Sequence, residues 1–300
     1  MINKVIYIKN KASRLGVAYI TLFFLLLASG LTSQNVEDRP YNLVTNSNTL
    51  GIGYSNILDP YLSPFEYIGT TIGYKAQRRQ YFSHRDTLFS VSNQFYVQIG
   101  EGEHPTRINS MLFLNGNYDL GFHYHWRSLP GLTLLLGGSW DVDLGGKYIA
   151  RNVNNPFSLD IYSNINASLS VNYKFGIDFF HKYRQNLRIE YGMKTPLVGC
   201  MFVPQQGVSY YELFSLNNLT DAFHLSSIHN RRAVSQSLNL DIPVSFTTFR
   251  IGVNNDLLQY KVNNIVYHNY NFTTHIGCLV HFYVFQGTKN KPPRNFKSAY

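Results

Sequence analysis

The stretch from Leu112 to Arg127 constrains the fold more than any other part of the sequence, because its residues alternate in polarity. The even positions are apolar, aromatic or glycine, and from Asn115 onward the odd positions are polar or glycine. Side chains alternate between the two faces of a β-strand, so this stretch is predicted to be one strand with an apolar and a polar face. Strands of soluble domains average about 5–6 residues, whereas a barrel strand that crosses a membrane needs about 9–11. The length therefore favours a membrane-spanning strand.

The same alternation recurs along the rest of the chain. Leu132–Gly145 repeats it after the turn sequence Ser128–Gly131, which predicts an antiparallel hairpin. Further strands are predicted at Thr49–Ser55, Tyr67–Arg79, Thr87–Ile99, Ile161–Phe179, Leu187–Lys194, Ser209–Leu216, Phe223–His229, Leu238–Val244, Phe249–Val253 and Ile276–Val284. We therefore predict an all-β fold, a transmembrane antiparallel up-and-down β-barrel of about 12 strands, with its apolar face toward lipid and its polar face toward the lumen.

Composition supports this class of protein. Charged residues make up 14% of the chain, against about 25% in soluble domains, while Tyr (23) and Phe (21) are abundant, as the aromatic girdles of a barrel require. The formal charge of +9 includes no dense basic run, so we expect no nucleic-acid partner. After residue 33 no apolar run approaches the ~20 residues of a membrane helix, which leaves a barrel as the membrane-spanning form.

The N-terminal segment has the pattern of a secretory signal peptide. In Met1–Ser33, basic residues precede the apolar core Leu15–Leu27, and small residues follow it. We expect cleavage after Gly30 or Ser33; an uncleaved anchor helix is the alternative.

The predicted organisation is a signal peptide at 1–33, a short polar lead at 34–46, the barrel at 47–285 and a polar, basic periplasmic tail at 286–300. The predicted location is the outer membrane of a Gram-negative bacterium. The expected partners are outer-membrane lipids and the barrel assembly machinery, and the pattern does not predict an oligomeric state.

Loop lengths predict how the barrel is oriented. An even number of strands places both termini in the periplasm, so short turns are predicted there and long loops outside. The predicted periplasmic turns are Ser128–Gly131, Asn217–Thr220 and Ser245–Phe246, and the predicted external loops are Asn56–Pro64, Gly146–Leu159 and Thr195–Val208. The last loop is apolar and contains two prolines, so we expect it to pack over the barrel mouth or to contact a partner.

Charged residues on the polar faces are the candidate lumen residues. Opposite charges in a confined lumen attract one another, so we expect them to pair and to narrow the opening. The predicted set is Lys75, Asp119, Asp141, Asp143, Lys174, Asp178, Arg188, Glu190, Lys194 and Asp241.

Three smaller patterns point to chemistry, each beside a plainer interpretation. His224 and Ser226 form a His-x-Ser pair, which resembles the pair that barrel lipid hydrolases use, with Asn239 or Asp241 as the partner of the histidine. The apolar neighbours of this pair turn it toward the lumen, however, so a polar lining role is preferred and no catalytic residue is assigned.

His123 and His125 share a face near Asp119, but no spacing typical of a metal site is present, and we expect neither a metal nor a cofactor. Cys200 and Cys278 differ in site and direction, so no disulfide is expected.

Three segments also indicate a family. Asp59-Pro-Tyr-Leu-Ser-Pro, Thr195-Pro-Leu-Val-Gly-Cys-Met-Phe-Val-Pro and Ser209-Tyr-Tyr-Glu resemble uncharacterised outer-membrane β-barrels known as domain of unknown function 3316. The resemblance covers nearly all of the mature chain and implies a barrel, and it supplies no activity.

The first functional interpretation is a narrow, selective pore or transporter for small solutes. A structural or surface-interaction barrel is the alternative, and a lipid hydrolase that uses His224 and Ser226 is a second alternative.

Overall fold

The computed structural model describes residues 41–82, 87–150, 155–179, 183–215, 219–244, 247–282 and 296–298. The predicted signal peptide, most of the predicted lead and most of the predicted tail lie outside these residues, as does the side chain of Asp178. Within them, no helix is both long enough and apolar enough to cross a membrane.

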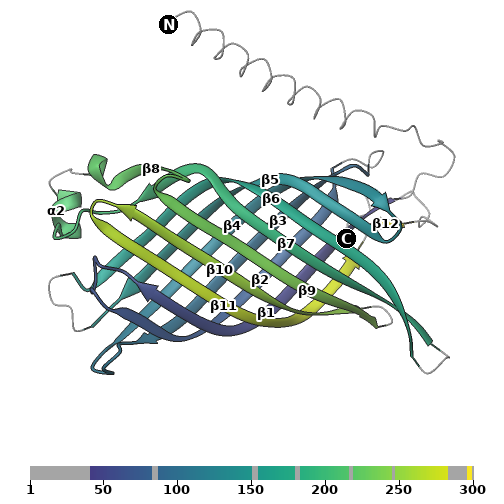
Figure 1. Ribbon diagram of the computed structural model, residues 1–300, viewed down its shortest axis with the longest axis horizontal. Coiled ribbons are helices and arrows are strands. Elements are labelled where there is room, and N and C mark those ends of the chain that lie inside the picture. The colour runs from purple at the N-terminus through teal and green to yellow at the C-terminus, as the bar shows by residue number, and fades with distance from the viewer. Residues whose placement is uncertain are drawn as a thin grey trace, which may run out of the picture. The chain divides into compact units, whose positions relative to one another are not determined.

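The described part of the chain is an antiparallel barrel with strongly tilted strands (Figure 1). In chain order its strands are β1 (Tyr41–Leu58), β2 (Glu66–Tyr81), β3 (Phe89–Glu103), β4 (Ser110–Leu129), β5 (Leu132–Tyr148), β6 (Phe157–Phe179), β7 (Tyr183–Phe202), β8 (Phe223–Ser227), β9 (Arg231–Val244), β10 (Thr247–Val262), β11 (Ile265–Phe282) and β12 (Phe296–Ser298). β11 pairs with β1 from Phe282↔Val44 to His268↔Leu58, which closes the sheet on itself. The predicted antiparallel barrel is confirmed.

Ten of the described strands form the closed wall, in the order β1, β2, β3, β4, β5, β6, β7, β9, β10 and β11. β8 pairs with β7 alone, and the three-residue β12 runs parallel to β1 outside the wall. The predicted strand at Ser209–Leu216 is instead a short helix, α2 (Tyr210–Ser215). A capping box explains the difference: Ser209 Oγ accepts from the backbone N–H of Glu212, and the Glu212 carboxylate accepts from the backbone N–H of Ser209.

The two faces of the wall differ in polarity as the alternation predicts. Outward side chains are large, apolar and exposed, as in Leu50 (62% exposed), Ile52 (67%) and Ile276 (67%). The inward positions of β1 are small or polar and buried, including Thr49 and Ser55. A polar interior and an apolar exterior are the reverse of a soluble protein and match a barrel whose solvent is lipid.

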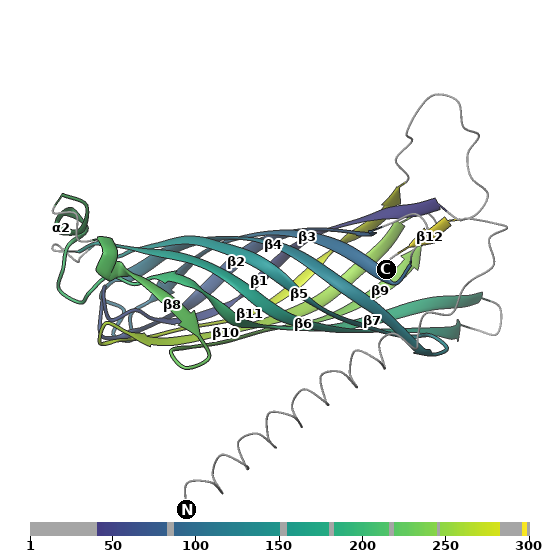
Figure 2. The ribbon, with the colours of Figure 1, turned by 90° about the horizontal axis from the view of Figure 1, so that it is seen from above.

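The connections fall at two ends of the barrel. At the loop end the chain passes from β1 to β2, from β3 to β4, from β5 to β6, from β7 to β8 and from β10 to β11; at the turn end it passes from β2 to β3, from β4 to β5, from β6 to β7 and from β9 to β10. Two predictions fail here. The predicted periplasmic turn Asn217–Thr220 is wrong, because its described residues, Leu219 and Thr220, lie at the loop end in a 3₁₀ turn, η1 (Leu219–Ala222), between β7 and β8. Residues 195–202 continue β7 rather than forming a loop, because they remain paired with β6. Figure 2 shows α2 and β8 at the loop end of the barrel.

Candidate functional site

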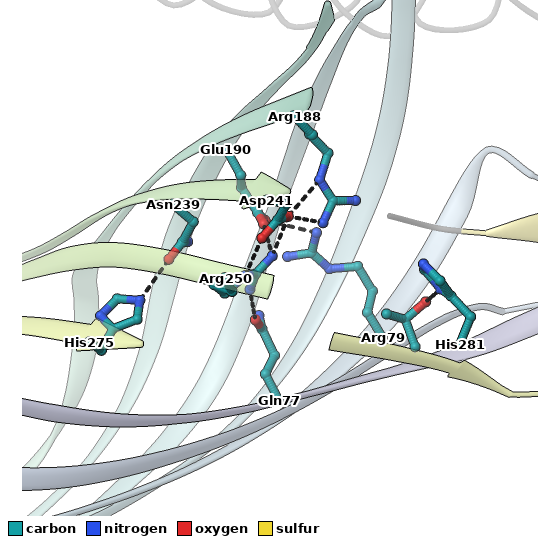
Figure 3. A network of polar contacts seen from close by, with 10 residues as sticks. Gln77, Arg79, Arg188, Glu190, Asn239, Asp241, Arg250, His275 and His281 are labelled. Atoms are coloured by element: carbon teal, nitrogen blue, oxygen red, sulfur yellow. Dashed lines mark hydrogen bonds and ion pairs between the residues drawn. The ribbon is translucent and has the colours of Figure 1, made fainter. Parts of the chain in front are cut away.

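A network of buried ion pairs crosses the interior of the barrel (Figure 3). Arg79 Nη1 on β2 lies 3.0 Å from Glu190 Oε1 on β7. Arg250 on β10 contacts Glu190 Oε2 at 3.0 Å and Asp241 Oδ1 at 2.7 Å, and Arg188 Nε donates to Asp241 Oδ2 at 2.8 Å. β2 and β7 are on opposite sides of the ten-stranded wall. The pair between Arg79 and Glu190 therefore spans the lumen.

Neutral side chains complete this network. Arg250 also donates to Gln77 Oε1 at 3.4 Å, and the Asn239 amide oxygen lies 2.8 Å from Nε2 of His275. Buried charges are costly unless each is paired and hydrogen-bonded. Here Glu190 and Asp241 each accept from two arginines, so the charges stabilise one packed arrangement across the lumen.

A second cluster of charges lies along β4, β5 and β7. Lys194 Nζ is 2.7 Å from Asp119 Oδ2 and 2.8 Å from Asp141 Oδ2, so one ammonium group bridges two carboxylates. Ser139 Oγ donates to Asp119 at 2.8 Å, and the Asn164 amide donates to Asp141 at 2.8 Å. These contacts fill the polar interior between the three strands.

The interior at the loop end is closed by apolar and aromatic packing. Lys147 on β5 forms ion pairs with Asp59 (3.1 Å) and Asp160, and its Nζ lies 4.7 Å from the ring centroid of Tyr267 on β11. β5 and β11 are opposite one another in the wall, so this contact also crosses the lumen. One cluster of buried residues surrounds it, drawn from the strands and loops around the barrel: Ile57, Tyr61, Leu62, Tyr67, Met111, Phe113, Ile149, Tyr162, Met201, Val203, Tyr260, Ile265 and Tyr267.

Two tyrosines fasten the loops to this cluster. The Tyr61 hydroxyl donates to the carbonyl of Val208 at 2.9 Å, and the Tyr210 hydroxyl accepts from the backbone N–H of Leu159 at 2.7 Å. Burial raises the pKa of Tyr210 to about 12 and raises the pKa of Tyr61 as well. Both phenols therefore remain protonated at neutral pH, which keeps the hydrogen bond from Tyr61 in place.

A cavity of about 240 Å³ lies between the ion-pair network and the loop-end cluster. Its lining reaches Arg79 and Glu190 at one side and Tyr162 and Tyr267 at the other. Amide and hydroxyl side chains make up most of the remaining wall, among them Gln94, Asn115, Asn117, Ser168, Ser170, Ser235, Ser237, Asn254, Asn269 and Asn271. The interior thus contains a polar chamber that borders the ion-pair network on one side and the loop-end cluster on the other.

The structure places most of the predicted lumen charges in these clusters. Asp119, Asp141, Arg188, Glu190 and Asp241 are buried and Lys194 is partly buried, all with the partners given above. Asp143 accepts from the Asn117 amide at 2.8 Å, and both Asp143 and Lys75 line the cavity. Lys174 is exposed on β6.

Several charged residues with equal roles are missing from the predicted set. Arg79 and Arg250 hold the central network, and Lys147 and Asp160 pair beneath the loop-end cluster. Alternation points to the two arginines, because Arg79 has the same parity as Lys75 and Arg250 lies between two outward residues, Phe249 and Ile251. The sequence carries no comparable signal for Lys147, which lies in the predicted loop Gly146–Leu159, or for Asp160, which directly follows that loop.

The proposed hydrolase residues are not assembled into a triad. Ser226 is buried, and His224 Nε2 lies 2.9 Å from the amide nitrogen of Asn263. The two residues predicted to orient the histidine are engaged elsewhere, Asn239 with His275 and Asp241 with two arginines. This geometry does not support a nucleophile and base pair at β8.

The two histidines that were considered as metal ligands, and the two cysteines, have ordinary surroundings. His125 Nε2 is 2.8 Å from Ser90 Oγ, and His123 is buried next to it on β4. Among the described residues, no group of three or more His, Cys, Asp and Glu side chains has the geometry to hold a metal ion. Cys200 and Cys278 are both free thiols.

Comparison with solved structures finds outer-membrane β-barrels at very low sequence identity. The outer membrane protease OmpT from Escherichia coli is 8% identical with a TM-score of 0.42, over 84% of this chain and 100% of that one. The transport unit of the autotransporter AIDA-I from Escherichia coli is 9% identical with a TM-score of 0.45, over 87% and 97%. The translocator domain of the autotransporter NalP from Neisseria meningitidis is 7% identical with a TM-score of 0.37, over 91% and 98%. These similarities concern the fold alone.

Sequence comparison identifies a family without an assigned activity. No curated protein matches the chain. One family model, described as Protein of unknown function (DUF3316), matches residues 20–289 and so covers most of the chain. The chain, a closed antiparallel β-barrel, therefore belongs to the DUF3316 family, as the three sequence segments indicated.

Proposed function

We propose that the protein resides in the outer membrane of a Gram-negative bacterium and provides a narrow, selective pathway for small solutes that is closed along its axis at rest. The observation that supports this most directly is the ion pair between Arg79 and Glu190, which spans the lumen from β2 to β7. The apolar outer face takes outer-membrane lipids as its partner, and the barrel assembly machinery is the second proposed partner.

Two closures in series determine how such a pathway opens. The central network blocks one side of the cavity, and the aromatic cluster around Tyr267 blocks the other. Substitution of Arg188 alone leaves the ion pair between Arg250 and Asp241 in place, and it does not affect the aromatic cluster around Tyr267. A single truncation is therefore expected to raise conductance only slightly, whereas truncation of both closures is expected to open the axis.

Single-channel recordings in planar bilayers test this proposal. We expect very low conductance in the unaltered protein, a small rise in Arg79→Ala or Tyr267→Ala, and a large rise in the double variant Arg79→Ala/Tyr267→Ala. Tyr118→Ala is the matched control, because Tyr118 points outward (42% exposed) and its loss leaves the lumen unchanged. A large, unselective conductance in the unaltered protein would overturn the proposal in favour of a general porin.

A structural or surface-interaction barrel is the second candidate. The observation that favours it is the pair of exposed aromatic side chains on α2, Tyr211 (78% exposed) and Phe214 (57%), at the loop end. Uptake of small solutes by vesicles that contain the unaltered protein separates the two functions. Uptake no faster than in empty vesicles, across sugars, amino acids and inorganic ions, would favour the barrel without transport.

A further inference from the structure

Among the described residues, ten charged side chains line the cavity inside the barrel, and most of them already have a partner. Six form the ion pairs given above: Arg79, Asp119, Asp141, Asp160, Glu190 and Lys194. A seventh, Arg231, donates to Asn164 Oδ1, and its guanidinium carbon lies 4.4 Å from the ring centroid of Tyr162. Three charges therefore remain.

These three charges belong to Lys75, Asp143 and Asp256, which are all partly buried. Within the part of the chain that the structure describes, none of them forms an ion pair, either with one another or with a further group. Asp143 has a neutral partner, the Asn117 amide, at 2.8 Å. A charge in a confined interior is costly unless an opposite charge compensates it. The cavity thus offers one ammonium and two carboxylates to a charged solute.

Lys75 and Asp143 lie at the two ends of one row of side chains. Lys75 on β2 is paired with Tyr96 on β3. Asn117 on β4 is paired with Tyr96 on one side and with Asp143 on β5 on the other. All four residues line the cavity. Directly paired residues on neighbouring strands have Cβ atoms about 4.5–5.5 Å apart, so three such steps separate the positive charge from the negative one along this part of the wall.

Asp256 lies on the other half of the ring. β10 is opposite β4 in the ten-stranded wall. Asp256 is paired with Ser235 on β9, which is paired in turn with Lys194 on β7. The ammonium of Lys194 already bridges Asp119 and Asp141, so it is not free to compensate Asp256. The three remaining charges therefore face the cavity from different sides of the barrel.

The number and sign of these charges define a complementary solute. The ammonium takes one carboxylate, and the two carboxylates take two cationic groups, in charge-assisted hydrogen bonds of the stronger kind. Pockets for drug-sized ligands have volumes of about 300–1,000 Å³, so a cavity of about 240 Å³ suits a smaller molecule. Free basic amino acids such as L-lysine, L-ornithine and L-arginine are small and carry one carboxylate and two cationic groups.

We propose that the cavity binds a free basic amino acid, with the carboxylate at Lys75 and the two cationic groups at Asp143 and Asp256. This inference rests on the proposed pathway for small solutes and names the class of solute. A neutral amino acid leaves one of the two carboxylates uncompensated, and a diamine leaves Lys75 uncompensated. Both kinds of molecule therefore bind more weakly than a basic amino acid.

Equilibrium dialysis of the whole protein in detergent micelles tests the site without requiring transport. The probes are L-lysine, L-norleucine, which lacks the side-chain ammonium, and cadaverine, which lacks the carboxylate. Each analogue loses one charge-assisted contact, so we expect each to bind at least about tenfold more weakly than L-lysine. The same dialysis of Tyr267→Ala, in which the loop-end cluster is truncated, shows whether slow entry limits binding.

Variants connect each charge with one group of the ligand. Lys75→Met is expected to bind L-lysine at least about tenfold more weakly and cadaverine no more weakly than the unaltered protein does. Asp256→Asn is expected to weaken binding of L-lysine by a similar factor and to leave L-norleucine, with its single cationic group, close to unchanged. Glu103→Gln is the matched control, because Glu103 is exposed and lies outside the cavity lining.

The outcomes separate the site from the proposed function. No binding of L-lysine by the unaltered protein and by Tyr267→Ala would overturn the site, as would equal affinities for L-lysine and L-norleucine. Binding of L-lysine without uptake into protein-containing vesicles would support the site and overturn the pathway. Uptake of small solutes without any binding of L-lysine would overturn the site and leave the pathway in place.

Discussion

At the scale of single residues, two serines on neighbouring strands show how the interior differs from place to place. Ser139 and Ser170 both occupy the polar face in the sequence pattern. In the structure both serines line the cavity, but Ser139 is 6% exposed and donates to Asp119, whereas Ser170 is less buried. A larger side chain at Ser139 therefore displaces the hydrogen bond to Asp119.

Arginine substitutions test this difference together with the outer face. Leu169→Arg places a charge among outward apolar residues, where it is expected to cost roughly 2–4 kcal/mol at the bilayer midplane. Ser170→Arg is expected to cost much less, and Ser139→Arg is expected to be strongly destabilising because it displaces the Asp119 contact. Urea unfolding of vesicle-reconstituted protein measures all three. Equal losses at residues 169 and 170 would contradict the assignment of the two faces.

The central carboxylate Glu190 gives a second residue-scale prediction. Glu190→Ala leaves Arg79 and Arg250 buried without their carboxylate, and breaking a buried pair in this way typically costs about 3–5 kcal/mol. Glu103→Ala is the control, since Glu103 pairs with Arg107 at 3.6 Å where both side chains are more than half exposed, and such pairs contribute about 0–1 kcal/mol. Similar unfolding free energies for the two variants would show that the network is not stabilising.

At the scale of elements, the β10–β11 turn fastens the loop end together. Asn263 and Asn264 have positive φ values of 51° and 63°, as a two-residue type I′ hairpin turn requires. The Asn263 amide also donates to the carbonyls of Val203 (2.8 Å) and Asp221 (3.2 Å). This one residue sets the turn and holds the β7–β8 connection against the barrel.

Substitution of the two asparagines separates these roles. Asn263→Ala loses both hydrogen bonds and places at positive φ an alanine, whose side chain cannot hydrogen-bond to the nearby backbone. The variant is therefore expected to lose at least about 1–2 kcal/mol of folding stability. Asn264→Gly keeps the Asn263 contacts and tolerates positive φ, so it is expected to be close to neutral. Limited proteolysis followed by mass spectrometry is expected to show faster cleavage in residues 203–222 for Asn263→Ala only. Equal cleavage rates would indicate that other contacts hold this connection.

At the scale of the whole molecule, the proposed outer-membrane location requires export of the chain. The N-terminal pattern of basic residues, apolar core and small residues predicts removal of the first 30 to 33 residues during export. Intact-mass measurement of the protein extracted from outer membranes is expected to give a mass that lacks this segment. Retention of Met1–Leu27 would favour the anchor-helix alternative.

The sequence by itself determined the class of fold and the face of the residues in the regularly alternating strands. Alternation with a period of two is a local property, so it can be recognised in one strand without knowledge of its neighbours. It placed Leu112–Arg127 in a long strand and assigned Arg188 and Glu190 to the polar face, and it carries the same information for Arg79 and Arg250. Likewise, the Ser209–Glu212 capping box is a local signal for the helix that was predicted to be a strand.

Only the tertiary structure decided which polar residues meet. Whether Arg79 reaches Glu190 depends on the registers of all the strands between β2 and β7, and a shift of one residue at any of them would separate the pair. The ten-stranded closure depends on the same registers, because it is a property of how strands pair around the ring. Registers are set by packing and hydrogen bonding between distant segments, which is why the position of the cavity and its closures could not be obtained from the pattern within any one strand.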